Sequence, residues 1–235
     1  DKLLKEWTKG IADARCQTRK LGDMADVLYD RQFVKSANLS VGVYHVYRNI
    51  PFSSQTNMPP FSELRYDITT IPSFMLGQEY RKTYGHYHAI GASGLPHAEI
   101  YEVLQGMTHV LLQKIEEEKI TDICLVEASL GDKVEVPPGY GHLLINPSTE
   151  MLVTGNLVSR RCKQDNGPFR KMHGAAYYEL SEHHLVRNPS YGEVPKLRTE
   201  APNTRFPKNR GLRHLLLKDP ERFRFLIDPI LYPSI

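Results

Sequence analysis

The chain has 235 residues, of which 40% are hydrophobic and 24% charged, a composition typical of a folded globular domain and not of a disordered chain. Its formal charge is only +3, and the basic residues form no stripe, so nucleic-acid binding is disfavoured. No apolar run is long enough for a membrane-spanning helix, and Cys16, Cys124 and Cys162 form neither a disulfide framework nor a zinc motif. We therefore expect reduced thiols, a cytoplasmic location, and no membrane or nucleic-acid partner.

Helix and loop are predicted for the first 40 residues. Leu3, Leu4, Trp7 and Ile11 recur at helical spacing. Residues 22–30, "GDMADVLYD", favour a further short helix or turn. We interpret residues 1–40 as a helical N-terminal segment.

Strand patterns begin at about residue 41. The runs "VGVYHVYRN" (41–49) and "LRYDITTI" (64–71) alternate and are rich in β-branched and aromatic residues. Similar short runs follow, separated by turn-forming residues, at 85–90, 99–104, 108–115, 122–128, 133–137, 142–147 and 151–158. Many short strands at this spacing predict an all-β sandwich or barrel over residues 41–163.

The strand periodicity ends after about residue 163. Residues 188–209 are proline-rich, and residues 210–231 favour one or two short helices. We interpret residues 164–235 as a C-terminal extension that packs on the barrel or on a partner subunit.

Three histidines and one glutamate have the spacing of a metal site. His86 and His88 are two residues apart, so on a strand both side chains point to one face. Glu99 opens the next strand, and His142 follows the turn-forming Pro-Pro-Gly at residues 137–139. Imidazole nitrogens with a carboxylate oxygen suit iron, manganese, nickel, zinc or cobalt.

Other histidines have plainer interpretations. His97 lies in the loop between His88 and Glu99 and is expected at the rim of the site. His109 alternates with apolar residues and is expected to be a partly buried structural residue. His183 and His184 are adjacent, so they do not share a face and are expected at the surface.

Two stretches resemble the two sequence motifs of the cupins. His86, His88, Glu99 and Gly106 fill the first motif, with ten residues instead of three or four between the second histidine and the glutamate. Tyr80 replaces the glycine that begins this motif. The second motif is matched at every fixed position, by Gly131, Pro137, Gly139, His142 and Asn146.

Within the cupins, the chain is most similar to the archaeal-type glucose-6-phosphate isomerases. "TYGHYH", "AEIYEVLQG" and "VPPGYGH" resemble that family's metal-site motifs, and "RKLGDMADVLYD" resembles its N-terminal segment. The resemblance covers about residues 18 to 158, in the same order. It implies a cupin fold, a double-stranded β-helix or jelly-roll barrel.

The resemblance also implies roles for individual residues. It makes His86, His88, Glu99 and His142 the ligands of one divalent transition metal per chain, iron first, with manganese, nickel or zinc as alternatives. Glu99 and Tyr101 would be catalytic. The residues that would bind the substrate phosphate are Tyr44, Thr70, Thr83 and Gly85.

One departure affects the closing of the active site. Val158, Gln164 and Asn166 stand where the family has Tyr, His and Tyr. Either His173, Tyr177 and Tyr178 replace them, or the substrate differs. The inserted residues 89–98 are expected to lie over the mouth of the barrel and shape substrate access.

The predicted function is that of a metal-dependent isomerase interconverting glucose 6-phosphate and fructose 6-phosphate, in glycolysis or gluconeogenesis. Another sugar phosphate, metal-dependent dioxygenase chemistry and a non-catalytic sugar-binding role remain as alternatives. Because small cupins often pair, we expect a homodimer.

Overall fold

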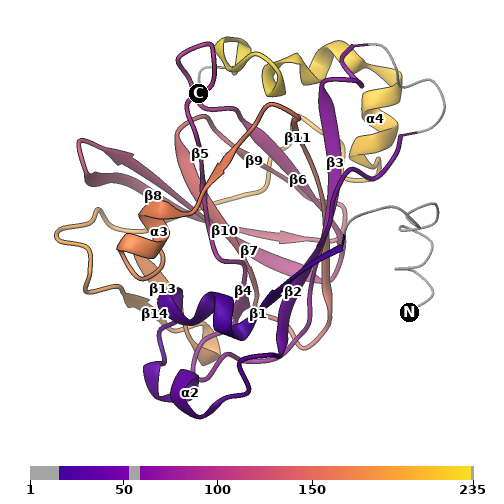
Figure 1. Cartoon of the computed structure of the whole chain (residues 1–235). Coiled ribbons are helices and arrows are strands. Elements are labelled where there is room, and N and C mark those ends of the chain that lie inside the picture. Colours follow the sequence, from indigo (N-terminus) through magenta and orange to yellow (C-terminus); the bar gives the residue numbers. More distant parts are fainter. Residues whose placement is uncertain (1–15, 53–58, 234–235) are drawn as a thin grey trace.

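Two β-sheets form a barrel in the computed structural model, which describes residues 16–52 and 59–233 (Figure 1). The first sheet has the strand order β1 (Cys16–Lys20), β2 (Gly42–Tyr47), β3 (Leu64–Ile71), β11 (Leu152–Ser159), β6 (Glu99–Gln105) and β9 (Lys133–Val136). The second has the order β15 (Arg198–Glu200), β8 (Lys119–Ser129), β7 (Met107–Glu116), β10 (Tyr140–Asn146) and β4 (Arg81–Lys82). The predicted all-β, cupin-type fold is confirmed.

Two short strand pairs complete the β-structure. They are β5 (Tyr87–His88) with β12 (Gln164–Asp165), and β13 (Tyr177–Glu179) with β14 (Leu185–Arg187). Every pairing is antiparallel except that of β15 with β8, among the residues that the structure describes. Each run expected to be a strand between residues 41 and 158 contains a strand.

The N-terminal segment is only partly helical, and this corrects the expectation for residues 1–40. The 3-10 helix η1 (Leu21–Val27) and α2 (Arg31–Ser36) fall within it, but Cys16–Lys20 forms an edge strand paired with β2. Pairing with a distant strand, which local periodicity does not report, decides the conformation here. The helical spacing at Leu3, Leu4, Trp7 and Ile11 lies outside the described residues.

Short helices account for much of the C-terminal part. They are α3 (Gly167–Lys171), η2 (Ser181–His183), α4 (Leu212–Lys218), η3 (Pro220–Leu226) and η4 (Pro229–Leu231). Since β15 joins the second sheet, residues 164–235 are not wholly separate from the barrel. Within residues 16–52 and 59–233, no helix combines the length and the apolar character needed to cross a membrane.

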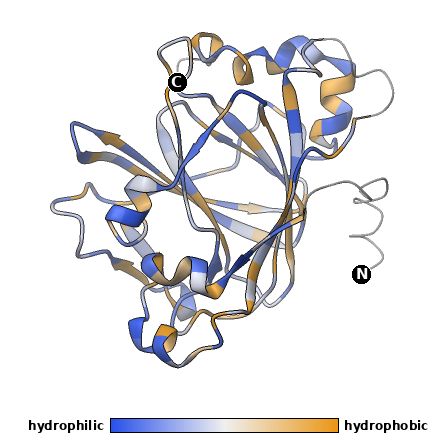
Figure 2. Cartoon of the chain, in the orientation of Figure 1, coloured by the Kyte–Doolittle hydropathy of each residue, from blue (hydrophilic) through white to orange (hydrophobic). Residues whose placement is uncertain are grey.

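Alternation along β3 separates a polar inner face from an apolar outer face of the first sheet. Asp67 and Thr69 line the barrel pocket, whereas Tyr66 and Ile68 belong to a second hydrophobic cluster. Figure 2 shows hydrophobic and hydrophilic residues alternating along several strands. The inner face is therefore free to carry functional side chains.

The C-terminal helices cover the outer face of the first sheet (Figure 1). Leu216 and Phe223 are fully buried in the same cluster as Ile100 and Leu157 of the sheet. Polar contacts fix the helices in place, because buried Glu102 accepts hydrogen bonds from the Tyr66 hydroxyl and the Leu212 main chain, both at 2.8 Å. The extension thus packs on its own barrel.

A buried lysine on β9 ties the segment before α4 to the same sheet. The Lys133 ammonium donates to the main-chain carbonyls of Gly131, Pro207, Lys208 and Arg210 at 2.7 to 3.3 Å. These carbonyls satisfy a charge that would otherwise be costly to bury. The C-terminal helices are therefore an integral part of the fold.

Two neighbouring leucines on α4 test this conclusion. Leu216→Ala should lower the free energy of unfolding by about 2–5 kcal/mol, because Leu216 is fully buried against the sheet. Leu217→Ala is the matched control, and since Leu217 is 42% exposed it should cost under about 1 kcal/mol. Urea denaturation of both variants measures the difference. Equal effects would show that α4 does not contribute to the barrel's stability.

Candidate functional site

Four donor groups converge inside the barrel. Glu99 Oε2 lies 3.1 Å from His88 Nε2, 3.2 Å from His142 Nε2 and 4.0 Å from His86 Nε2. One ligand atom from each of the four residues lies within 4.8 Å of the others. The residues come from three places in the chain: the β4–β5 segment, the start of β6 and β10.

Backbone pairing holds two of these histidines together. His86 N donates to His142 O at 3.1 Å, and His142 N donates to His86 O at 3.0 Å. Their rings follow, with centroids 4.4 Å apart. The loop-borne His86 is therefore positioned as firmly as a strand residue.

The hydrogen bonding of His88 shows that the donor set fits a metal ion. His88 Nδ1 lies 2.7 Å from the carbonyl oxygen of His97, so Nδ1 carries the proton of the neutral ring. Nε2 is then an acceptor that faces another acceptor, Glu99 Oε2, at 3.1 Å. Only a proton or a cation between them makes this contact favourable.

Burial and mutual charge shape the ionisation of the cluster. Burial alone would raise the pKa of Glu99, but His142 and His88 hold it well below its usual range. Burial alone would lower the pKa of His88, but Cys162 and Glu99 raise it to about 10. Burial and neighbouring imidazoles lower the pKa of His86, and burial lowers that of His142 despite Glu99. Without a metal, the cluster thus holds one proton between His88 and Glu99.

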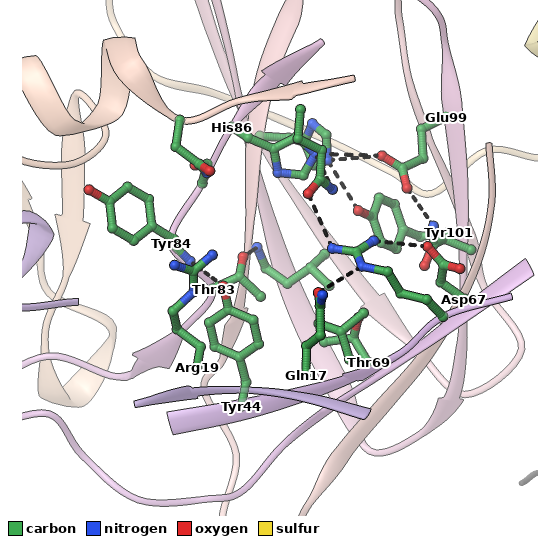
Figure 3. Close-up of a pocket in the computed structure, with 18 of the residues that line it drawn as sticks. Gln17, Arg19, Tyr44, Asp67, Thr69, Thr83, Tyr84, His86, Glu99 and Tyr101 are labelled. Atoms are coloured by element: carbon green, nitrogen blue, oxygen red, sulfur yellow. Dashed lines mark hydrogen bonds and ion pairs between the residues drawn. The ribbon is translucent and has the colours of Figure 1, made fainter. Parts of the chain in front are cut away.

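A polar cavity of about 350 Å³ opens beside the cluster (Figure 3). His86, Glu99 and His142 line it, and Tyr101 lies among them with its hydroxyl 3.1 Å from His142 Nε2. Burial and Glu99 raise the pKa of Tyr101 well above its usual value, so the phenol stays protonated. Asn156 donates to Glu99 Oε1 at 2.5 Å and fixes the carboxylate.

An arginine network crosses the pocket wall. The Arg48 guanidinium contacts Asp67 Oδ2 at 3.1 Å and donates to the side-chain oxygens of Gln17 and Gln164 at 3.0 and 3.2 Å. Gln164 Nε2 in turn lies 3.1 Å from His86 Nε2. The network therefore connects buried Asp67, through Arg48 and Gln164, to His86 of the donor cluster.

A second arginine, Arg19, was missed because its strand was expected to be helical. It lines the pocket beside Tyr44 and Thr83, and its guanidinium lies over the Tyr84 ring at 5.4 Å (Figure 3). No carboxylate pairs with Arg19 in the part of the chain that the structure describes. This end of the pocket therefore offers an anion a positive charge.

Residues with hydroxyl groups and a glycine line the same pocket as Arg19. Thr83 Oγ1 accepts from Leu144 N at 3.0 Å, which leaves its hydroxyl proton free to donate. Gly85 has a φ of +87°, and a Cβ there would lie 2.6 Å from the Phe169 ring, so only glycine fits. Tyr44, Thr83 and Gly85 all line the pocket, as the sequence predicts.

Thr70 does not lie where it was expected. Its neighbour Thr69 lines the pocket, while Thr70 is buried and pairs with His45 on β2. Successive strand residues face opposite sides, so a shift of one position moves the side chain out of the cavity. Thr69, and not Thr70, thus faces the cavity.

Of the three positions that depart from the family, two reach the pocket. Gln164 and Asn166 line it, and Asn166 Nδ2 donates to Gly85 O at 2.7 Å. Val158 is buried in β11 and does not line it. The suggested replacements also lie elsewhere, since none of His173, Tyr177 and Tyr178 lines this cavity.

The inserted residues 89–98 do not lie where they were expected, at the mouth of the main cavity. No residue from 89 to 98 lines the main cavity, and Ile90 and His97 instead border a separate one with Arg161 and Ile230. His97 is buried and not at the rim, with Nδ1 3.2 Å from Leu226 O. The carbonyl of His97 orients His88, so the loop supports the donor cluster from the side away from the cavity.

The two other expectations for histidines have different outcomes. His109 is structural and more deeply buried than expected, with Nδ1 2.8 Å from Glu179 Oε1. His184 is exposed, as expected, and His183 keeps 56% of its side chain exposed while contacting Glu179. The three cysteines are free thiols.

Two solved structures align with part of the chain. A vicilin from Capsicum annuum aligns with a TM-score of 0.37 and 14% identity, over 52% of this chain and 30% of the vicilin. A variant of oxalate decarboxylase from Bacillus subtilis aligns with a TM-score of 0.33 and 17% identity, over 53% of this chain and 26% of that protein.

Two relatives are more similar in sequence. The chain is 29% identical to glucose-6-phosphate isomerase of Thermococcus litoralis over 136 residues, 58% of this chain and 65% of that protein. It is 30% identical to the Thermococcus gammatolerans enzyme of the same name over 144 residues, 61% of this chain and 69% of that protein. The family model for glucose-6-phosphate isomerase matches residues 18–196, which include every member of the donor cluster and every residue that lines the pocket except Gln17. The chain belongs to the glucose-6-phosphate isomerase family.

Proposed function

We propose that the chain is a metal-dependent aldose–ketose isomerase that interconverts glucose 6-phosphate and fructose 6-phosphate. The observation that carries this proposal is a single cavity lined by three of the four donors, His86, Glu99 and His142, and also by Arg19, Tyr44 and Thr83 (Figure 3). A sugar phosphate has a carbonyl end, which suits a metal ion held by the donors, and a phosphate end, which suits the positive charge of Arg19. Family membership supports the same assignment.

His86, His88, Glu99 and His142 are proposed to hold one divalent transition metal. Three imidazole nitrogens and one carboxylate oxygen suit iron, which we place first, and also manganese, nickel or zinc. When bound, such an ion acts as a Lewis acid on an oxygen of the sugar. Gln164, beside His86 Nε2, would orient that oxygen by hydrogen bonding.

Glu99 is proposed to carry the proton of the isomerisation. It would take the proton from carbon 2 of the aldose and return it to carbon 1, while the hydroxyl proton on oxygen 2 moves to oxygen 1. Tyr101 stays protonated and would donate a hydrogen bond to the oxygen on which charge develops. The low pKa of Glu99 makes it a weak base, so a direct hydride shift from carbon 2 to carbon 1 is the alternative route.

The phosphate is proposed to bind at Arg19. The guanidinium supplies charge, and the Tyr44 hydroxyl, the Thr83 hydroxyl and the Gly85 main-chain N–H supply further donors. Thr69 takes the position expected for Thr70. Charge-assisted hydrogen bonds of this kind favour a dianion over an uncharged sugar.

A related sugar phosphate is the second candidate substrate. Gln164 and Asn166 line the pocket where the family has His and Tyr, so the hydrogen-bonding groups that meet the sugar differ. Neither amide titrates, which leaves proton transfer to Glu99. Two further proposals complete the function: a homodimer, and a cytoplasmic location, which the three free thiols support.

The reaction itself is tested by reconstitution. Metal-stripped protein should convert fructose 6-phosphate in a coupled assay after addition of Fe²⁺, Mn²⁺, Ni²⁺ or Zn²⁺. His142→Ala should lose tight metal binding and at least about 100-fold in turnover, because one of four ligands is gone. His214→Ala, an exposed histidine on α4, is the control. Intact metal binding with no turnover for any ion would contradict the isomerase assignment.

Metal binding should release a proton. Because the pKa of His88 is raised to about 10, the metal-free site holds a proton between pH 7 and 9 that the ion must displace. Affinity should therefore rise about tenfold per pH unit in this window and level off near pH 10. Calorimetry in buffers of different ionisation enthalpy counts the proton. An affinity that stays flat from pH 7 to 9 is the opposing outcome.

Replacing Arg19 should weaken phosphate recognition. Arg19→Gln should raise KM for the sugar phosphate about tenfold or more, since a hydrogen bond to a charged group is worth about 1.5–3 kcal/mol. Lys20→Gln, at the exposed neighbouring position of β1, is the matched control. Affinity for the unphosphorylated sugar should not change. An unaltered KM would place the phosphate elsewhere.

A further inference from the structure

A second cluster of metal-binding side chains lies outside the pocket. His109 of β7, Glu179 of β13 and His183 of η2 bring one ligand atom each within 4.8 Å of the others. Glu179 Oε1 lies 2.8 Å from His109 Nδ1 and 2.9 Å from His183 Nδ1. None of the three residues lines the main cavity.

The charge of Glu179 needs a partner. Its side chain is only 1% exposed, and a buried carboxylate is costly without a compensating cation. The two nearby cations are engaged elsewhere, since Lys82 pairs with Glu79 at 2.6 Å and Arg81 donates to the carbonyls of Gly42 and Val43. Among the described residues, only the two imidazoles contact the Glu179 carboxylate. The charge is balanced only if the cluster holds a proton or a metal cation.

The backbone before β14 is strained in a way that aims His183 at this carboxylate. Glu182 and His183 have φ values of 57° and 58°, two consecutive left-handed residues that are not glycine. Such strain is concentrated at functional sites. The turn brings the His183 ring to 5.5 Å from the His109 ring and 5.4 Å from the Tyr80 ring.

We propose that His109, Glu179 and His183 form a second divalent-metal site, of the class that binds zinc. Two imidazole nitrogens and a carboxylate oxygen are a common three-ligand set, with water completing the coordination. The 56% exposure of His183 leaves one side open to solvent for that water. Donors on a tetrahedral zinc ion lie about 3.4 Å apart, so both imidazole nitrogens must move away from the Glu179 oxygen by about half an ångström, the exposed His183 more freely than the buried His109.

The position of the site indicates what the metal does. It joins the β13–β14 pair to β7, which runs through the second sheet of the barrel. An ion bound there ties a peripheral hairpin to a central strand. Bound metal stabilises the folded chain by mass action, so the melting temperature should depend on zinc concentration.

Metal counting tests the proposal independently of catalysis. Metal-stripped protein saturated with Zn²⁺ and passed through a desalting column should retain two equivalents per chain, measured by elemental analysis. His183→Ala should retain one, as should Glu179→Gln, which keeps the shape of the side chain and one acceptor oxygen but not its charge. His142→Ala should also retain one, because it removes the other site. His184→Ala, the exposed neighbour, should retain two.

Co²⁺ provides a second readout, since its visible absorption reports the ligands. The spectrum of the wild type minus that of His183→Ala should give a distinct imidazole–carboxylate band. Melting curves without metal check that His183→Ala folds. One equivalent in the wild type, or two in His183→Ala, would overturn the proposal and leave a hydrogen-bonded cluster that holds only a proton.

Discussion

The buried carboxylate of Glu99 is the constraint on which the rest of the structure depends. It is 1% exposed, and three imidazole nitrogens meet one of its oxygens within 4.0 Å. A carboxylate at such depth is tolerated only if its surroundings compensate its charge. Strand pairing, the His97 carbonyl and the Asn156 amide all act to hold this arrangement around the Glu99 carboxylate.

A polar interior requires apolar packing elsewhere. The inner face of the first sheet carries Asp67, Glu99 and Asn156 beside apolar residues such as Ile71 and Val103, so only part of it contributes to the hydrophobic core. Its outer face compensates, because residues such as Ile100 and Leu157 pack against the C-terminal helices. Lys133 and Glu102 fix those helices through buried hydrogen bonds. The extension thereby allows a sheet with a functional inner face to remain stable.

Local patterns were sufficient for the main strands between residues 41 and 158 and for the donor cluster, because both depend on spacing that is visible in the chain. His86, His88 and Glu99 are close in sequence, and His142 follows a recognisable turn. Thr69 and Thr70 are adjacent β-formers that the pattern does not distinguish, and only strand register shows which one faces inward. Arg19 and Glu179 depend on pairings over long sequence separations, which periodicity does not report.

Gln164, which stands where the family has histidine, is held in the site by hydrogen bonds. Its amide lies between Arg48 and His86, so its two polar ends are fixed by a cation and by an imidazole. An amide donates and accepts hydrogen bonds but does not exchange protons near neutral pH. A histidine at this place would offer a second acid or base beside Glu99. With glutamine there, the side chain links Arg48 to His86, and the isomerisation that we propose relies on Glu99 alone for proton transfer.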